Sequence, residues 1–129
     1  MISLPVLLGQ LMVILQAHPL CSRVVVVETK EFSPRQFFFK IRAELSENYK
    51  FQVRIYYNKG HIDYAYQLFS DVPLLRWDNK EEFRGLESYP HHHHDKDGSV
   101  CTSPLKGDPV KDIEYVLEKL AVFLAEQTL

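Results

Sequence analysis

Cysteine is scarce in this sequence. The two that occur, Cys21 and Cys101, are separated by most of the chain. A disulfide framework needs several paired cysteines, and a structural zinc site built on cysteine needs four ligands at short spacings. Two distant cysteines fit neither a disulfide framework nor such a zinc site. We therefore expect both to be buried and to pack as small apolar residues, and we expect the protein in a reducing compartment.

Positive charge is not in excess either. Lysine and arginine number 15 against 17 aspartates and glutamates, which gives a formal net charge of −2 with neutral histidines. A chain that is basic throughout is thereby excluded, although a local basic patch for RNA or DNA is not.

A long uninterrupted apolar segment is also missing. The most apolar stretch, residues 1–22, contains Pro5 and Gly9, and its continuous apolar parts are shorter than the ~20 residues that a membrane span requires. We therefore expect a core helix of a cytoplasmic protein without a membrane partner. The helix should end near His18, because the residue before a proline avoids the helical backbone. A signal peptide is the alternative.

Five segments have the composition and alternation of β-strands. In residues 35–45, Phe37, Phe39 and Ile41 alternate with a second set that is polar except for Phe38, which is the period of a half-buried strand. Turns of two to four residues join the segments, so no crossover helix fits between them and an antiparallel meander is expected. The expected strands are residues 24–30, 35–45, 49–57, 61–69 and 73–78.

The alternation stops after Asp78. Residues 79–98 are polar and interrupted by proline and glycine, and a loop of this length inside a small domain is usually functional. A second helix is expected from Asp108, a good N-cap, and Pro109, which suits the first helical position. Residues 1–129 should thus form a single α+β domain: an antiparallel meander of about five strands, with an N-terminal and a C-terminal helix packed on one face.

The sheet face away from the helices is expected to carry Lys40, Arg42 and Arg54. Such cations suit either an ordinary solvated face or a surface that binds phosphates, and we take all three as candidate substrate-binding residues. Tyr66 is a fourth candidate, as a ring on which a base stacks; the alternative is that Tyr66 and Trp77 are core residues.

Four consecutive histidines, residues 91–94, stand inside the long loop. Side chains alternate in an extended chain, so His92 and His94 should point one way and His91 and His93 the other. A pair on one side, helped by an aspartate such as Asp78, could hold a metal ion, but no spacing here is diagnostic of a zinc site. We therefore expect that the protein uses no metal or other cofactor. A metal-dependent hydrolase is the alternative.

Acid–base chemistry fits the histidines better. Histidine titrates near neutral pH, so two of them can serve as base and acid without a cofactor. Cleavage of RNA by its own 2′-hydroxyl needs such a pair and a cation for the phosphorane charge, which Arg76 or Arg54 would supply. The alternative is a solvated histidine loop with no task.

Three short motifs resemble the TumE family of small toxins from prokaryotic toxin–antitoxin pairs. They are Tyr64-x-Tyr66, then Arg76-Trp77-Asp78-Asn79, then Pro90-His91-His92-x-His94. The similarity spans roughly residues 50–125, and the N-terminal third agrees only in its order of a helix followed by strands. The chain departs from the family where a further His-His pair often follows Asp-Asn, since it reads KEEFRG from Lys80 to Gly85.

The resemblance implies a toxin neutralised by an antitoxin encoded beside it, which we expect to be a helix-turn-helix protein. Combined with the chemistry above, it predicts a type II toxin that cleaves or binds RNA without a metal. The catalytic candidates are His91, His92, His94, Arg76 and Asp78. Among them, His92 and His94 are assigned as acid and base, Arg76 to the phosphate and Asp78 to orienting a histidine; Asn79 should turn the chain.

A second hypothesis is a non-enzymatic module whose exposed sheet face or edge binds another protein. A homodimer is compatible with either hypothesis.

Overall fold

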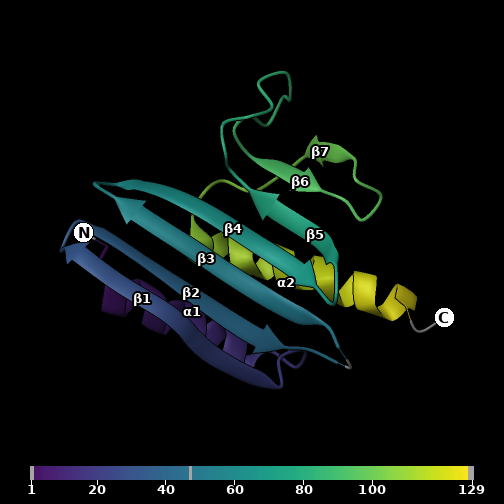
Figure 1. The fold of residues 1–129 in the computed structure, drawn as a ribbon, viewed down its shortest axis with the longest axis horizontal. Coiled ribbons are helices and arrows are strands. Elements are labelled where there is room, and N and C mark those ends of the chain that lie inside the picture. The colour runs from purple at the N-terminus through teal and green to yellow at the C-terminus, as the bar shows by residue number, and fades with distance from the viewer. Residues whose placement is uncertain (1, 47, 128–129) are drawn as a thin grey trace.

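The computed structural model describes residues 2–46 and 48–127. Helix α1 comes first, seven strands follow, and helix α2 closes the chain (Figure 1). The bounds are α1 Leu4–Ala17, β1 Arg23–Ser33, β2 Gln36–Glu44, β3 Lys50–Asn58, β4 His61–Phe69, β5 Pro73–Asp78, β6 His92–His94, β7 Val100–Thr102 and α2 Pro109–Gln127.

The strands form one antiparallel sheet in which each strand pairs with the next along the chain, from β1 to β7. The α+β meander is therefore confirmed, but the expected number of about five strands was too low. The two additional strands, β6 and β7, lie inside and just after the predicted loop. Each has only three residues, too few for an alternating pattern to be recognised in the sequence.

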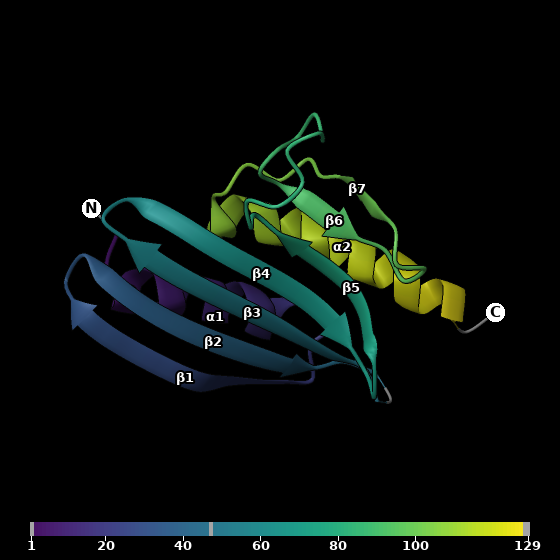
Figure 2. The ribbon, with the colours of Figure 1, turned by 45° about the horizontal axis from the view of Figure 1, so that its top comes forward.

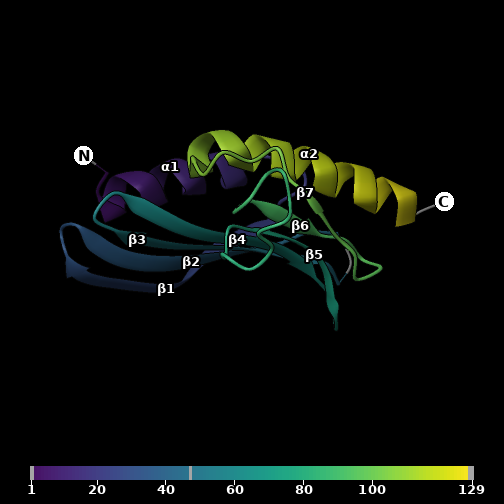
Figure 3. The same ribbon diagram turned by 90° about the horizontal axis from the view of Figure 1, so that it is seen from above.

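Both helices lie on the same face of the sheet, as the view from above shows (Figure 3). Leu7, Leu11 and Leu15 of α1 are buried against that face, and α2 adds Ile113, Leu117 and Leu120. The alternating apolar residues of β2, β3 and β4 meet them, and Phe37, Phe39 and Ile55 are fully buried. One apolar cluster thus joins both helices and the central strands.

The end of α1 and the start of α2 follow the predicted signals. The side chain of Ser3 accepts a hydrogen bond from the Val6 N–H of α1, and the chain leaves the helical conformation at His18. At α2, a carboxylate oxygen of Asp108 accepts from the Val110 N–H. No helix in residues 2–46 and 48–127 is both long and apolar enough to cross a membrane.

The two cysteines differ from the expectation. Cys21 and Cys101 are free and only half-buried. Cys21 follows α1 directly, and Cys101 lies in β7, the short strand at one edge of the sheet. Both positions are at the margin of the core, and burial nevertheless raises the pKa of the Cys21 thiol to about 11.

The opposite face of the sheet, which we call the open face, is covered by no helix of residues 2–46 and 48–127 (Figures 2 and 3). The strand register aligns its side chains in rows that cross the sheet. One row runs through Lys40, Arg54, Ala65, Asp78 and His92. The neighbouring row runs through Arg42, Gln52, Gln67, Arg76 and His94.

Candidate functional site

The histidine run pairs with the Arg-Trp-Asp motif across β5 and β6. Asp78 is the register partner of His92, and Arg76 is the partner of His94. Because side chains alternate along a strand, these four point to the open face, whereas Trp77 and His93 point to the helix side. The pleat therefore brings together residues that are about fifteen positions apart in the sequence.

Asp78 lies at the centre of this group. Its side chain is only 6% exposed, and its Oδ2 accepts a hydrogen bond of 2.7 Å from Nε of Arg76. Its Oδ1 accepts from the backbone N–H of Lys80 at 3.0 Å. Nε2 of His92 lies 2.9 Å from Oδ1, and Nε2 of His94 lies 3.5 Å from Oδ2. One buried carboxylate thus contacts a guanidinium and both imidazoles.

His92 is almost completely buried, and its tautomer follows from its other contact. Nδ1 lies 3.1 Å from the carbonyl oxygen of Pro90, and a carbonyl can only accept, so Nδ1 carries a hydrogen. Nε2 lies close to Asp78, yet it has no aligned hydrogen-bond partner among the described residues. Nε2 is therefore the nitrogen of His92 that faces the carboxylate of Asp78.

His94 is the more accessible of the two histidines, with a side chain that is 32% exposed. Its ring meets the ring of His92 edge-on, with centroids 4.8 Å apart. Burial lowers its pKa from the ordinary value of 6.5, and the nearby His92 and Arg76 act in the same direction against the opposing charge of Asp78. At neutral pH the neutral form, which can accept a proton, is favoured.

Phe83 covers this group from the long loop. Its ring packs edge-on against His92, at 4.7 Å between centroids, and against His94, at 5.9 Å. Phe83 belongs to the KEEFRG segment from Lys80 to Gly85. Sequence reasoning did not select it, because one phenylalanine in a polar loop carries no signal of what it contacts.

Asn79 holds the start of the same loop. Its side-chain amide accepts a hydrogen bond from the Tyr64 N–H at 3.0 Å and donates one to the carbonyl of Ile62 at 2.8 Å. These bonds continue the pairing of β4 and β5 beyond Asp78. Asn79 thus redirects the chain at the end of β5, and neither of these hydrogen bonds involves a histidine.

His91 and His93 lie on the helix side of the sheet. Nδ1 of His91 is 2.7 Å from the hydroxyl of Tyr64, and the His93 ring packs on Trp77 with 4.6 Å between centroids. The structure therefore does not bring His91, one of our catalytic candidates, to the Asp78 group. The two-sided arrangement expected for the four histidines is the one observed.

The candidate substrate-binding residues also divide between the open face and the helix side of the sheet. Lys40, Arg42 and Arg54 lie on the open face, where Arg42 donates to Gln52 at 2.7 Å and the Arg54 guanidinium lies 5.4 Å from the centre of the Phe38 ring. Tyr66 is 0% exposed, on the helix side. It offers no surface to a ligand in this structure and is a core residue, because its strand position faces the helices.

Comparison with known proteins identifies the chain's relatives. The family model described as toxin TumE matches residues 11–128. The chain belongs to the TumE toxin family. The match extends well beyond residues 50–125 and includes α1 from Leu11 onward, so the N-terminal third shares more with the family than the order of its elements. No curated protein and no solved structure gave a significant match.

Membership in the TumE family implies a cognate antitoxin as partner, because the family consists of toxins. The Arg-Trp-Asp-Asn and Pro-His-His-x-His motifs both lie inside the matched region. The structure adds that the two motifs form adjacent strands, β5 and β6, rather than a strand and a free loop.

Three residues of this TumE-family chain have the arrangement of metal ligands. One ligand atom each from Asp78, His92 and His94 lies within 4.8 Å of the others. The surrounding charges fit a cation poorly, however. Asp78 already forms an ion pair with the guanidinium of Arg76, so a divalent ion beside the two imidazoles would meet no uncompensated negative charge.

The histidine run also predicts how stability depends on pH. Burial lowers the pKa of His91, His93 and His94 below 6.5 in the folded state. The unfolded chain therefore takes up protons first as the pH falls, and stability is lost from about pH 7 downward through 6.5 toward the folded-state values.

We expect the melting temperature to be lower at pH 5.5 than at pH 7.5, and His93→Gln to reduce this difference. Thermal unfolding followed by circular dichroism at both values measures the effect. A higher melting temperature at pH 5.5 would contradict the buried neutral state of these rings.

Proposed function

We propose that this chain is the toxin of a type II toxin–antitoxin pair and that it cleaves RNA by metal-independent acid–base chemistry. One observation carries the proposal: the buried carboxylate of Asp78 contacts Arg76, His92 and His94 on the open face of the sheet. Two imidazoles and a guanidinium within reach of one phosphodiester are the groups that attack by a 2′-hydroxyl requires.

The exposure of each side chain supports its role. His94 is the accessible histidine, and its lowered pKa leaves it neutral at pH 7, so it acts as the base toward the 2′-hydroxyl. Arg76 is 37% exposed and uses Nε on Asp78, which leaves its terminal nitrogens for the phosphate.

His92 acts as the acid toward the leaving 5′-oxygen. Because Phe83 packs on its ring, the bound RNA must displace Phe83 to reach Nε2. Asp78 orients both histidines and the guanidinium, so it is a positioning residue in this scheme. Catalytic contacts of this kind often form only when the substrate is bound.

The products of the purified protein test this mechanism. Attack by the 2′-hydroxyl gives one fragment with a 2′,3′-cyclic phosphate and one with a free 5′-hydroxyl. A single 2′-deoxy substitution at the cleaved nucleotide should abolish cleavage there. Cleavage that persists on the 2′-deoxy substrate, or that leaves 5′-phosphates, would exclude the proposed route.

A metal-dependent hydrolase is the second candidate, favoured by the proximity of Asp78, His92 and His94. The ion pair of Asp78 with Arg76 supports the metal-independent mechanism over this candidate. We expect cleavage by the untagged protein to proceed at the same rate after dialysis against a chelator. A loss of activity that zinc or manganese restores would instead support the metal site; because consecutive histidines bind nickel and zinc regardless of role, binding alone decides nothing.

The toxin role itself is tested in cells. RNA is the proposed target, so we propose that the protein acts in the cytoplasm. Expression without its neighbour should arrest bacterial growth, and co-expression of the adjacent helix-turn-helix reading frame should restore it. Normal growth of cells that contain the folded protein would contradict the proposal.

A non-enzymatic binding module is favoured by one feature of β1. This strand forms an edge of the sheet, and Val25, Val26 and Val27 are 39%, 41% and 43% exposed. Exposed apolar edge strands pair with other chains, which suits an antitoxin or a second copy of this chain. A stable heteromer whose free subunit cleaves no RNA would support this function over the enzymatic one.

A further inference from the structure

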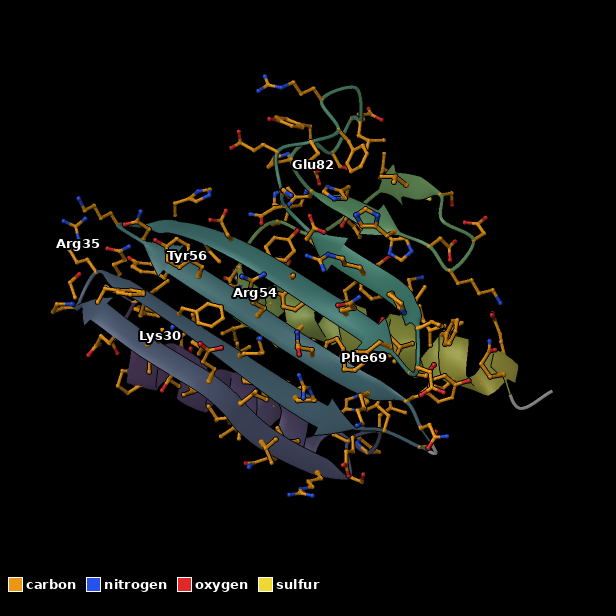
Figure 4. All side chains as sticks on the ribbon, viewed as in Figure 1. Lys30, Arg35, Arg54, Tyr56, Phe69 and Glu82 are labelled. Carbon is orange, nitrogen blue, oxygen red and sulfur yellow. The ribbon has the colours of Figure 1, made fainter. Side chains whose placement is uncertain are left out.

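A cavity of about 560 Å³ lies on the open face beside the Asp78 group. Arg54 and Tyr56 border it from β3, and Figure 4 shows both side chains on the face turned away from the helices. Arg76 and Asp78 border it from β5. Its volume is within the range of about 300–1,000 Å³ that is typical of small-molecule sites.

Ala65 borders this cavity, and its methyl group is the smallest side chain of its row. Ala65 stands in the row between Arg54 and Asp78, and its neighbours on the same face of β4 are Asp63 and Gln67. A longer side chain at this position would occupy the space between the guanidinium of Arg54 and the carboxylate of Asp78. Nothing in the composition of the strand indicated that one alanine would matter, because its effect depends on the rows to either side.

The walls of the cavity have the chemistry of a site for an aromatic ring with an attached phosphate. Phe38 and Tyr56 supply aromatic surface, and Arg54 lies over the Phe38 ring. Aromatic side chains and flat guanidinium groups are the surfaces on which nucleic-acid bases stack. Arg76 lies at the side nearest His94, which is its cross-strand partner.

We propose that this cavity binds one unpaired nucleotide of the RNA substrate, with the base over Ala65 and the phosphate at Arg76. The proposal rests on the proposed function and adds to it a substrate class and a specificity-determining residue. A base enters such a hollow only if it is unstacked, so the substrate is single-stranded RNA rather than a duplex. The bound nucleotide then places its phosphate next to His94.

Nucleotide binding to variants of Ala65 tests this inference without relying on cleavage. The four nucleoside 3′-monophosphates and inorganic phosphate are titrated separately into the wild-type protein, Ala65→Leu and Gln67→Leu. The dissociation constant of each is measured from the heat of binding or from NMR chemical-shift changes. Gln67→Leu is the matched control, because it adds the same side chain to the same face of β4 outside the cavity. Ala65→Val is the second variant, since valine suits a strand, should Ala65→Leu fail to fold.

We expect at least one nucleotide to bind the wild-type protein more tightly than inorganic phosphate. Ala65→Leu should weaken that binding by roughly tenfold or more, which is what loss of one stacked base corresponds to, and Gln67→Leu should not. Inorganic phosphate should bind all three proteins equally. Equal nucleotide binding to Ala65→Leu and wild type, or no preference for nucleotides over phosphate, would overturn the inference.

Failure of the proposed RNA cleavage can be distinguished from failure of the proposed nucleotide site. If a nucleotide binds in the Ala65-dependent manner but single-stranded RNA is not cleaved, the cavity is a binding site and the enzymatic mechanism is wrong. If RNA is cleaved by the wild type and equally fast by Ala65→Leu, the mechanism stands and the cavity does not bind the substrate.

Discussion

Replacing Asp78 with asparagine is expected to lower the rate of RNA cleavage by about 10²- to 10⁴-fold, the range that general acid–base catalysis provides, and to abolish growth arrest. The asparagine has the same shape and can still accept from the Lys80 N–H. It lacks the charge that holds the Arg76 guanidinium at 2.7 Å and that faces Nε2 of both histidines. Single-turnover cleavage of a labelled RNA measures the effect.

The control for this variant is Asp71→Asn, which removes the same charge from an exposed position outside strands β4 and β5. Its activity should equal that of the wild type. Melting temperatures separate the positioning role from a folding defect. Asp78→Ala, which leaves Arg76 without its buried acceptor, should lose about 2–3 kcal/mol of stability, whereas Asp78→Asn should lose less. Full activity of Asp78→Asn would remove the central premise of the mechanism.

Substitution of His94 by glutamine should reduce cleavage by about 10²- to 10⁴-fold as well, because the base of the reaction is lost. The pH dependence identifies the role. A base acts when it is deprotonated, so on the acidic side of the profile the wild-type rate should rise with pH through an apparent pKa below 6.5, since burial lowers the pKa of His94. Loss of the proton from the general acid limits the rate at higher pH. Rates measured from pH 4.5 to 8 test this, and the residual activity of His94→Gln should lack this rise.

His93 provides the matched control in the adjacent position. It belongs to the same strand, but its ring packs on Trp77 on the helix side and cannot reach a ligand on the open face. We therefore expect His93→Gln to cleave RNA at the wild-type rate. If His93→Gln and His94→Gln lose cleavage activity equally, the histidines matter for the folding of β6 and not for catalysis. If His94→Gln cleaves as fast as the wild type, His94 is not the base.

The sequence was sufficient to predict those strands in which the alternation of apolar residues is long. Strands β2, β3 and β4 each have nine residues, and burial alternates along them except at Ala65, so the period was clear and the antiparallel order followed from the short turns. Strands β6 and β7 have three residues each and were missed. Their pairing depends on β5 being already in place beside them, which is a long-range condition that no local pattern expresses.

For the site, the alternation of His92 and His94 against His91 and His93 could be predicted because it depends only on an extended backbone. The proximity of the two motifs was suggested by chemistry alone. The register that opposes Asp78 to His92 and Arg76 to His94 is set by the path of the loop between β5 and β6, including the side-chain bonds of Asn79 to β4.

The amino-acid sequence by itself determined the residue types, the two faces of each long strand and the sides on which the histidines lie, because these depend on contacts between near neighbours along the chain. Only the tertiary structure decided that Asp78 would be buried between three cationic or titratable groups, that Phe83 would cover the histidines and that Ala65 would leave a hollow beside them. Each of these depends on which strands are adjacent and in what register, and register is a property of the packed sheet as a whole.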